Sequence, residues 1–287
     1  DKMLVRNARQ AVEYGLVDSL LYDDQLTAEL KSRLTLTEDN DIKFIKLNKY
    51  RKSYSTYKSS KNEIAIIVGD GEIMPGKGNE GTIGGDKFAE QVRKARENDK
   101  VKAIVIRVNS PGGSFQASDI MWREITLASQ SKPVIASMGD YAASGGYYMA
   151  MGCDTIVAQP HTITGSIGIF SVLFDASDLM SNKLGITTEQ VKTGEFGEMI
   201  TISRALTENE KAVWQRKTEE GYEVFTSKAA EGRNMDVEQL KKVASGRVWT
   251  GAQAKERGLV DVLGGFDDAI NLAATAAGIS DDYKVRY

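Results

Sequence analysis

Short apolar runs alternate with amphipathic stretches along most of the chain. The runs Glu63–Val68, Val101–Val108 and Pro133–Met138 are rich in β-branched and other apolar residues and predict buried strands. Between and after them, the stretches near 87–97 and 117–128 predict helices. Because strands and helices take turns, the pattern predicts an α/β fold with a parallel sheet flanked by helices.

A longer helix is predicted further along the chain. Thr207 and Glu210 have the spacing of a capping box, which marks the beginning of a helix that extends towards Ala230. Trp214 and Phe225 belong to a set of apolar residues on this helix that suits a packing face.

The beginning of the chain repeats a pattern found near its C-terminus. Ala8–Leu26 and Ala252–Ile270 both contain an alanine, polar residues, the sequence GLVD, and then an aromatic residue followed by two aspartates. In the C-terminal copy, Thr250 is expected to cap a short helix and Gly258 to end it. We therefore expect residues 1–34 to be the C-terminal remnant of a preceding homologous domain, and the chain to be the second half of a duplicated protein.

A basic stretch separates this segment from the rest of the chain. Lys46–Lys61 contains six basic residues and no acidic residue, interleaved with three tyrosines. Residues 35–61 are interpreted as a solvated basic linker, and contact with anionic lipid is an alternative that rests on charge alone. The remaining residues, 62–287, are expected to form one large domain.

Composition excludes several classes of function. Lys and Arg number 37 against 40 Asp and Glu, so the net charge of −3 gives no reason to expect nucleic acid as a partner. The single cysteine, Cys153, excludes an internal disulfide and a cysteine-rich metal site, and no cofactor or metal is expected. The longest uncharged stretch, Thr155–Phe174, contains proline and glycines and is not a membrane span. Any export signal or anchor is expected upstream of Asp1.

Two glycine-containing segments each follow a predicted strand and precede a predicted helix. In Asn109–Ser114, Gly112 and Gly113 can adopt backbone conformations that turn their amides outward. In Ala142–Gly146, small residues let a helix begin close to the sheet, and Ser144 lies where free N–H groups favour negative charge. Each segment alone is common, but together they predict an oxyanion-binding loop and a serine nucleophile.

These motifs resemble those of a known peptidase family. NSPGGS at 109–114, YAASGGYYMA at 141–150 and TITGSIGIF at 162–170 are similar to motifs of the Clp peptidase and crotonase superfamily. Together with GRVWTG at 246–251 and GLVD at 258–261, they resemble the signal peptide peptidase A family, also called protease IV. The similarity extends from Asn62 to the C-terminus.

The resemblance implies a Clp/crotonase-like α/β fold and a serine endopeptidase without a cofactor. It implies that Ser144 is the nucleophile, and that the amides of Gly113 and Gly145 form the oxyanion hole. The expected substrates are signal peptides and other hydrophobic peptides, cleaved by a Ser-Lys dyad. The family also implies a ring-like homo-oligomer on the periplasmic face of a bacterial inner membrane.

The lysine that serves as general base is not identified in this chain. In single-length family members it follows a Lys, small residue, Gly pattern by three positions, which corresponds here to Gly197, after Lys192. Double-length members place the lysine in their first half, so the resemblance implies that an N-terminal half of the protein donates it. Lys192 is an alternative that requires a different register. The single histidine, His161, is expected to have a structural or surface role.

The resemblance also implies a role for Ser166, 22 residues after Ser144. It matches a family serine that hydrogen-bonds the lysine amine and orients it, and the plainer interpretation is a serine that caps a turn. Two further functions remain open at this point. One is a crotonase-type acyl-CoA enzyme, which uses the same pair of amides but needs no nucleophile, and the other is a non-catalytic scaffold.

Overall fold

The computed structural model describes residue 5 and residues 7–51 and 60–287. The chain divides by its contacts into two compact units, Asp1–Tyr57 and Lys58–Tyr287. Residues 1–4 and 6 of the predicted domain remnant and residues 52–59 of the predicted linker lie outside the described residues. No helix in the described part of the chain is long and apolar enough to cross a membrane.

The described part of the first unit contains three helices, α1 (Ala8–Glu13), α2 (Asp23–Arg33) and α3 (Leu47–Arg51). The first two have the same local structure as α9 (Gly251–Glu256) and α10 (Phe266–Ala276) near the C-terminus. After α1 the amide of Leu16 donates to the Ala11 carbonyl at 2.8 Å, and after α9 the amide of Leu259 donates to the Ala254 carbonyl at 2.9 Å. The first helix of each sequence copy therefore ends in the same type of turn.

The second unit is built around a mainly parallel sheet. Its strands follow the order β10-β1-β4-β5-β6-β9, and β7 pairs in parallel with β5 beyond the end of β6. Only β8 is antiparallel to its neighbour, β7. The strands are β1 (Glu63–Asp70), β4 (Val101–Ser110), β5 (Val134–Ala143), β6 (Thr155–Ala158), β7 (Ile163–Gly165), β8 (Val248–Thr250), β9 (Val262–Leu263) and β10 (Lys284–Arg286), and a separate pair is formed by β2 (Glu72–Met74) and β3 (Thr82–Gly84).

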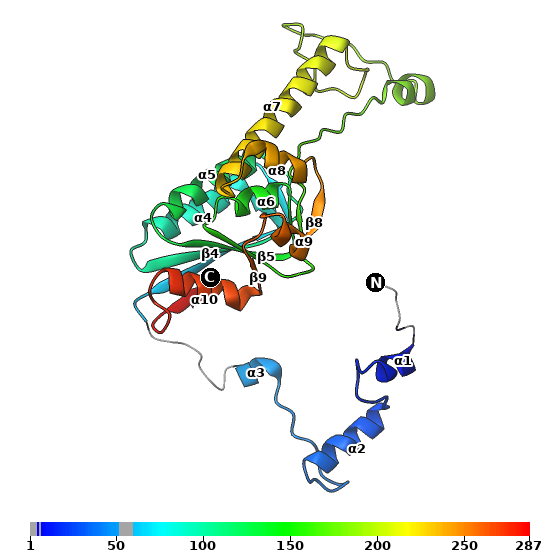
Figure 1. Ribbon diagram of the computed structural model, residues 1–287. Coiled ribbons are helices and arrows are strands. Elements are labelled where there is room, and N and C mark those ends of the chain that lie inside the picture. Colours follow the sequence, from blue (N-terminus) through cyan, green and yellow to red (C-terminus); the bar gives the residue numbers. More distant parts are fainter. Residues whose placement is uncertain (1–4, 6, 52–59) are drawn as a thin grey trace. The chain divides into compact units, whose positions relative to one another are not determined.

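Helices cover both faces of this sheet (Figure 1). Successive residues of a strand point to opposite faces, so Ile64 and Ile66 of β1 pack in one apolar cluster with α10, whereas Ala65 and Ile67 belong to the larger cluster on the other face. That larger cluster is covered by α4 (Gly85–Glu97), α5 (Phe115–Ser129), α6 (Gly145–Ala150), the C-terminal part of α7 (Glu208–Gly232) and α8 (Val237–Val243).

This architecture confirms the predicted fold class. The three predicted strands correspond to β1, β4 and β5, and the capping box of Thr207 and Glu210 begins α7. Both β4 and β5 run further than their apolar runs, into the two glycine-containing motifs. The short strands β2 and β3 were not predicted, because three-residue strands leave little periodicity to detect.

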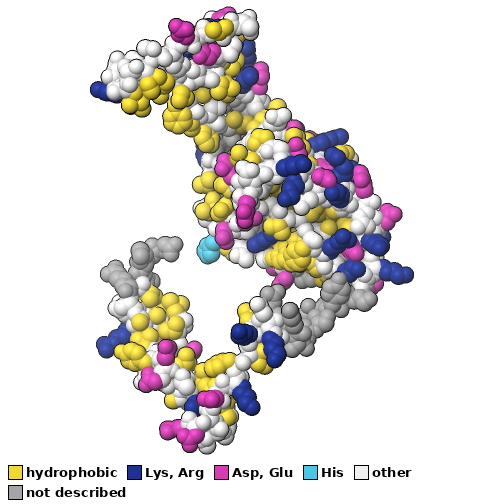
Figure 2. Space-filling model, turned by 180° about the vertical axis from the view of Figure 1, so that it is seen from behind, with side chains coloured by type: hydrophobic (Ala, Val, Ile, Leu, Met, Phe, Trp, Pro, Cys, Tyr) yellow, Lys and Arg dark blue, Asp and Glu magenta, His cyan; other side chains and the backbone are white. Residues whose placement is uncertain are grey.

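Residues 171–206, which we call the arm, connect the TITGSIGIF motif at 162–170 to α7. Apart from a short π-helix, Leu179–Lys183, the arm consists of turns and irregular backbone. Many of its apolar side chains are exposed (Figure 2), including Val172, Phe174, Ile186, Val191 and Ile200. The arm therefore does not form an apolar core of its own.

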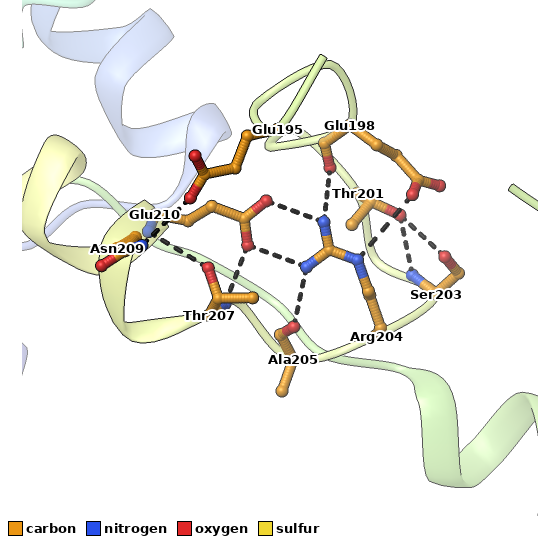
Figure 3. Close-up of polar contacts among 9 residues, drawn as sticks. All are labelled: Glu195, Glu198, Thr201, Ser203, Arg204, Ala205, Thr207, Asn209 and Glu210. Carbon is orange, nitrogen blue, oxygen red and sulfur yellow. Dashed lines mark hydrogen bonds and ion pairs between the residues drawn. The ribbon is translucent and has the colours of Figure 1, made fainter. Parts of the chain in front are cut away.

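A charged cluster fastens the end of the arm to the first turn of α7 (Figure 3). The Arg204 guanidinium donates to both carboxylate oxygens of Glu210, at 2.7 and 2.8 Å, and also to the carbonyl oxygens of Glu198 and Ala205. The amide of Thr207 donates to the same Glu210 carboxylate at 2.8 Å. These hydrogen bonds, the one from Arg204 above all, lower the pKa of Glu210 to about 2.

We expect Glu210→Gln to weaken the attachment of the arm to α7 and to remove the pH dependence of that attachment. The pKa of Glu210 is lower in the folded protein than in the unfolded chain. Its contribution to the stability of the folded state is therefore present above about pH 4.3, the pKa of a free glutamate, and is lost as the pH falls towards 2. Limited proteolysis at neutral pH should cut the arm of the variant several-fold faster than that of the wild type. Glu208→Gln is the control, because Glu208 lies in the same turn and, among the described residues, pairs only with Lys211. Equal cleavage rates for Glu210→Gln and wild type would contradict the assignment.

Candidate active site

The two glycine-containing motifs meet at the carboxyl ends of neighbouring strands. β4 and β5 pair in parallel, so the chain leaves both strands at the same edge of the sheet. The approach is close, since a Cβ atom added at Gly112 would lie 2.7 Å from the Gly145 nitrogen and 2.8 Å from the Ser144 Cβ. The sequence therefore needs glycine here for the two loops to touch.

The loop that contains Gly112 and Gly113 is hydrogen-bonded to β2, a strand that the sequence did not predict. The amide of Ile73, in β2, donates to the Gly112 carbonyl at 2.8 Å, and the amide of Ser114 donates to the Ile73 carbonyl at 2.8 Å. Gly112 and Gly113 have φ values of 108° and 148°, a region that glycine adopts without strain. Among the described residues, no hydrogen-bond acceptor pairs with the amide of Gly113. It is free to bind an oxygen of a ligand.

Ser144 has a strained backbone. Its φ of 52° and ψ of −118° are unusual for a residue with a side chain, and such strain costs about 1–3 kcal/mol. The amide of Ser144 donates to the Gly165 carbonyl at 2.9 Å, which fixes this conformation against β7. Within the described part of the chain, its hydroxyl has no hydrogen-bond partner. The Gly145 amide, at the beginning of α6, is likewise unpaired there.

Strand pairing brings Ser166 beside Ser144. β5 and β7 are parallel, and Ala143 is the register partner of Gly165, so the next residue on each strand is a serine. Ser166 also has a positive φ, 48°, and its amide donates to the Arg247 carbonyl at 2.7 Å. The spacing of 22 residues between the two serines thus corresponds to one step across the sheet.

Both serines open into one cleft of about 930 Å³. Its walls come from the first loop, the residues just before the arm, and α7, and include Pro111, Gly112, Gly113, Gly168, Ile169, Phe170, Thr218 and Tyr222. A smaller cavity of about 230 Å³ adjoins Ser144 and Gly145, and its lining side chains are mainly apolar: Phe115, Tyr148, Ile169, Phe170 and Phe225, with Ser118 and Ser171. No charged side chain among the described residues lines this smaller cavity.

Among the described residues, the charged side chains that line the cleft are the carboxylates of Glu72 and Glu219. Neither the cleft nor the smaller cavity is lined by a lysine or a histidine. Gly197 lies in the arm next to Lys192, since a Cβ atom added at Gly197 would lie 3.3 Å from the Lys192 Cβ. His161 is exposed in the turn between β6 and β7. Among the described residues there is also no group of acidic, cysteine and histidine side chains that suits a metal ion.

Comparison with known proteins gives the family. A sequence profile of peptidase family S49 matches residues 126–280, which include Ser144, Ser166 and the C-terminal motifs. The chain belongs to peptidase family S49. This confirms the expected relationship to the signal peptide peptidase A family, and membership of a peptidase family favours a peptidase over the acyl-CoA and scaffold alternatives.

Similar proteins occur in plants and bacteria. The chain is 41% identical over 281 residues to the chloroplastic serine protease SPPA of Arabidopsis thaliana, covering 95% of this chain and 41% of that protein. It is 40% identical over 273 residues to protease 4 of Salmonella typhi, covering 94% of this chain and 43% of that protein. A putative protease of Synechocystis is 36% identical, with 78% of each protein covered. The chain thus spans about two fifths of the length of the first two relatives.

A solved structure supports the fold. The 1510-N membrane-bound stomatin-specific protease, determined as a mutant, superposes with a TM-score of 0.50. The match covers 79% of this chain and 98% of that one at 17% sequence identity. At this identity the likeness shows a shared fold and no more.

We expect Gly113→Ala to reduce peptide hydrolysis by the full-length protein about 10²- to 10³-fold, the effect of losing one oxyanion donor. A Cβ at Gly113 would lie 2.2 Å from the Ile73 carbonyl oxygen, so the loop must shift. The measurement is kcat/KM on a hydrophobic fluorogenic peptide, with Tm as a check on folding. Gly81→Ala is the control, because Gly81 also has a positive φ but no atom near its missing Cβ. Equal losses in both variants would point to backbone strain alone.

Proposed function

We propose that this chain provides the nucleophile and the oxyanion hole of a serine endopeptidase that cleaves signal peptides and other hydrophobic peptides. The observation that carries the proposal is that Ser144, Gly113 and Gly145 line one small cavity, and that the Ser144 hydroxyl and the two glycine amides have no hydrogen-bond partner among the described residues. Family membership supports the same chemistry.

The proposed reaction has two steps. Ser144 Oγ attacks the carbonyl carbon of the peptide bond and gives its proton to a base, while the amides of Gly113 and Gly145 bind the oxygen that becomes negatively charged. The base then gives the proton to the leaving amine, and an ester between Ser144 and the acyl part of the peptide remains. Water, deprotonated by the same base, hydrolyses this ester and restores the serine.

The proposed base is a lysine from outside this chain, in an N-terminal half of the full-length protein. The cleft beside Ser144 is lined by no lysine among the described residues, and the family position corresponds to Gly197. A lysine that enters the cleft loses solvent, which lowers its pKa from about 10.4 and lets it accept a proton near neutral pH. In this proposal Ser166, which follows the register partner of Ala143, accepts a hydrogen bond from the amine and so orients it.

The smaller cavity supports the choice of hydrophobic substrates. It adjoins the nucleophile, and its aromatic and aliphatic lining suits an apolar side chain next to the cleaved bond. Burial of a leucine-sized side chain contributes about 1.5–3 kcal/mol, which corresponds to roughly 10- to 100-fold in kcat/KM if it is realised in the transition state.

Residues 1–34 are proposed to belong to a homologous first domain. Leu16 and Val17 are 67% and 43% exposed, whereas their counterparts in the C-terminal copy, Leu259 and Val260, are 0% and 2% exposed in the core. Among the described residues, this apolar pair is therefore buried in a core only in the C-terminal copy. The exposed apolar side chains of the arm support a homo-oligomer, and the periplasmic face of a bacterial inner membrane is the proposed location.

Hydrolysis of a fluorogenic peptide with a leucine before the cleaved bond tests the function. We expect the full-length protein to cleave it and Ser144→Ala to abolish cleavage, because the proposed reaction begins with attack by the Ser144 hydroxyl. This chain alone should be inactive, and mixing it with the separately produced N-terminal half should restore activity. Activity of this chain alone that still depends on Ser144 would show that the base lies within these 287 residues. Cleavage by the Ser144→Ala variant would refute the nucleophile.

A further inference from the structure

The apolar cavity beside Ser144 has one wall made by a tyrosine ring held among other rings. Tyr148, in α6, is 1% exposed. Its ring centroid lies 4.6 Å from that of Phe225 and 5.7 Å from that of Phe115, with the latter pair edge-to-face. Trp122 approaches the same ring edge-to-face at 6.3 Å. Such pairs restrict the ring to one orientation.

The hydroxyl of Tyr148 is fixed by a charged pair. It donates to Asp119 Oδ1 at 2.7 Å, and the amine of Lys228 donates to the same oxygen. The Lys228 amine also lies 3.8 Å from the centre of the Trp122 ring, a cation–π contact. Burial and the hydrogen bond to Asp119 raise the pKa of Tyr148, so the hydroxyl stays protonated and donates. We call Asp119, Tyr148 and Lys228 the brace.

The brace joins the three helices that surround the site. Asp119 lies in α5, which begins directly after the oxyanion loop, and Tyr148 lies in α6, which begins directly after Ser144. Lys228 lies in α7, whose Thr218 and Tyr222 line the cleft. The Asp119 carboxylate thus connects α5, which follows the oxyanion loop, and α6, which follows Ser144, to α7, which lines the cleft.

We propose that the brace sets the specificity of the cavity, with Asp119 as the positioning residue and Tyr148 as the residue that meets the substrate. The inference rests on the proposed function, in which the cavity takes an apolar side chain such as leucine next to the cleaved bond, and it names the residues that shape the cavity for that side chain. The hydroxyl of Tyr148 donates to Asp119, so the wall that Tyr148 forms offers ring carbons rather than a polar partner. A side chain with a polar end loses its hydration against this wall without compensation.

Binding of two peptide boronates, identical except for leucine or alanine at the first residue, tests this proposal. A boronate forms an adduct with the serine hydroxyl, so binding to the full-length protein can be followed by calorimetry without turnover, with Ser144→Ala as the blank. We expect the wild type to prefer the leucine compound. Tyr148→Phe and Asp119→Ala should each reduce that preference by roughly three- to tenfold, the size of the net contribution of a typical hydrogen bond. The alanine compound should bind as before.

A double variant separates positioning from a general structural effect. If Asp119 acts through Tyr148, then Tyr148→Phe combined with Asp119→Ala should reduce the preference no further than either change alone. Lys241→Ala is the matched control, because Lys241 forms a similar ion pair with Glu223 of α7, at 2.8 Å, away from the cavity. It should leave both affinities unchanged. Should Asp119→Ala fail to fold, Tyr148→Phe, which removes one oxygen atom, decides alone.

The outcomes distinguish this inference from the function on which it rests. A leucine preference that survives in Tyr148→Phe, with binding still dependent on Ser144, would overturn the brace and leave the peptidase intact. An equal loss of affinity for both compounds would also overturn it, because the brace would then be only structural. If neither compound binds the wild type in a way that depends on Ser144, the proposed function fails, and the inference fails with it.

Discussion

The contact between the Gly112–Gly113 backbone and the turn at Ser144–Gly145 is the constraint on which the site depends. Three positions in this contact have no room for a Cβ atom: at Gly112 it would meet Gly145, at Gly113 it would meet Ile73, and at Gly145 it would lie 2.5 Å from the Ser118 hydroxyl. Parallel pairing of β4 and β5 creates the contact, and the absence of side chains lets it close. The proposed pair of oxyanion donors is a product of this close approach.

The same strands explain how strain is tolerated at the proposed nucleophile. Ser144 is held at a positive φ by its hydrogen bond to Gly165 and by the packing of α6, in which Tyr147 and Tyr148 are fully buried. The energy that stabilises this conformation comes from the buried core around α6, which is the usual source for strain at functional sites. The aromatic residues that anchor α6 also form the cavity wall, so stability and specificity share the same side chains.

The sequence predicted what depends on local pattern. β-branched runs predicted β1, β4 and β5, and the capping box predicted α7. The glycine motifs predicted an oxyanion-binding loop and a serine nucleophile, and the structure shows that parallel pairing of β4 and β5 brings the two motifs together. The position of Ser166 beside Ser144 was implied by family resemblance alone, since no short-range pattern reveals that β7 pairs with β5. Ile73 and the brace were not predicted, because they depend on contacts between segments far apart in the chain. The base was not predicted as a residue of this chain, and the described residues bring no lysine to the cleft.

The most direct test of the central claim is to map the residue that a serine-directed phosphonate modifies. The full-length protein would be treated with a phosphonate that carries an apolar side chain, digested, and analysed by tandem mass spectrometry. The account predicts a single adduct on Ser144, which is lost when the compound is replaced by one with a charged side chain. An adduct on Ser166 or on another serine, with Ser144 unmodified, would contradict the assignment of the nucleophile and the function built on it.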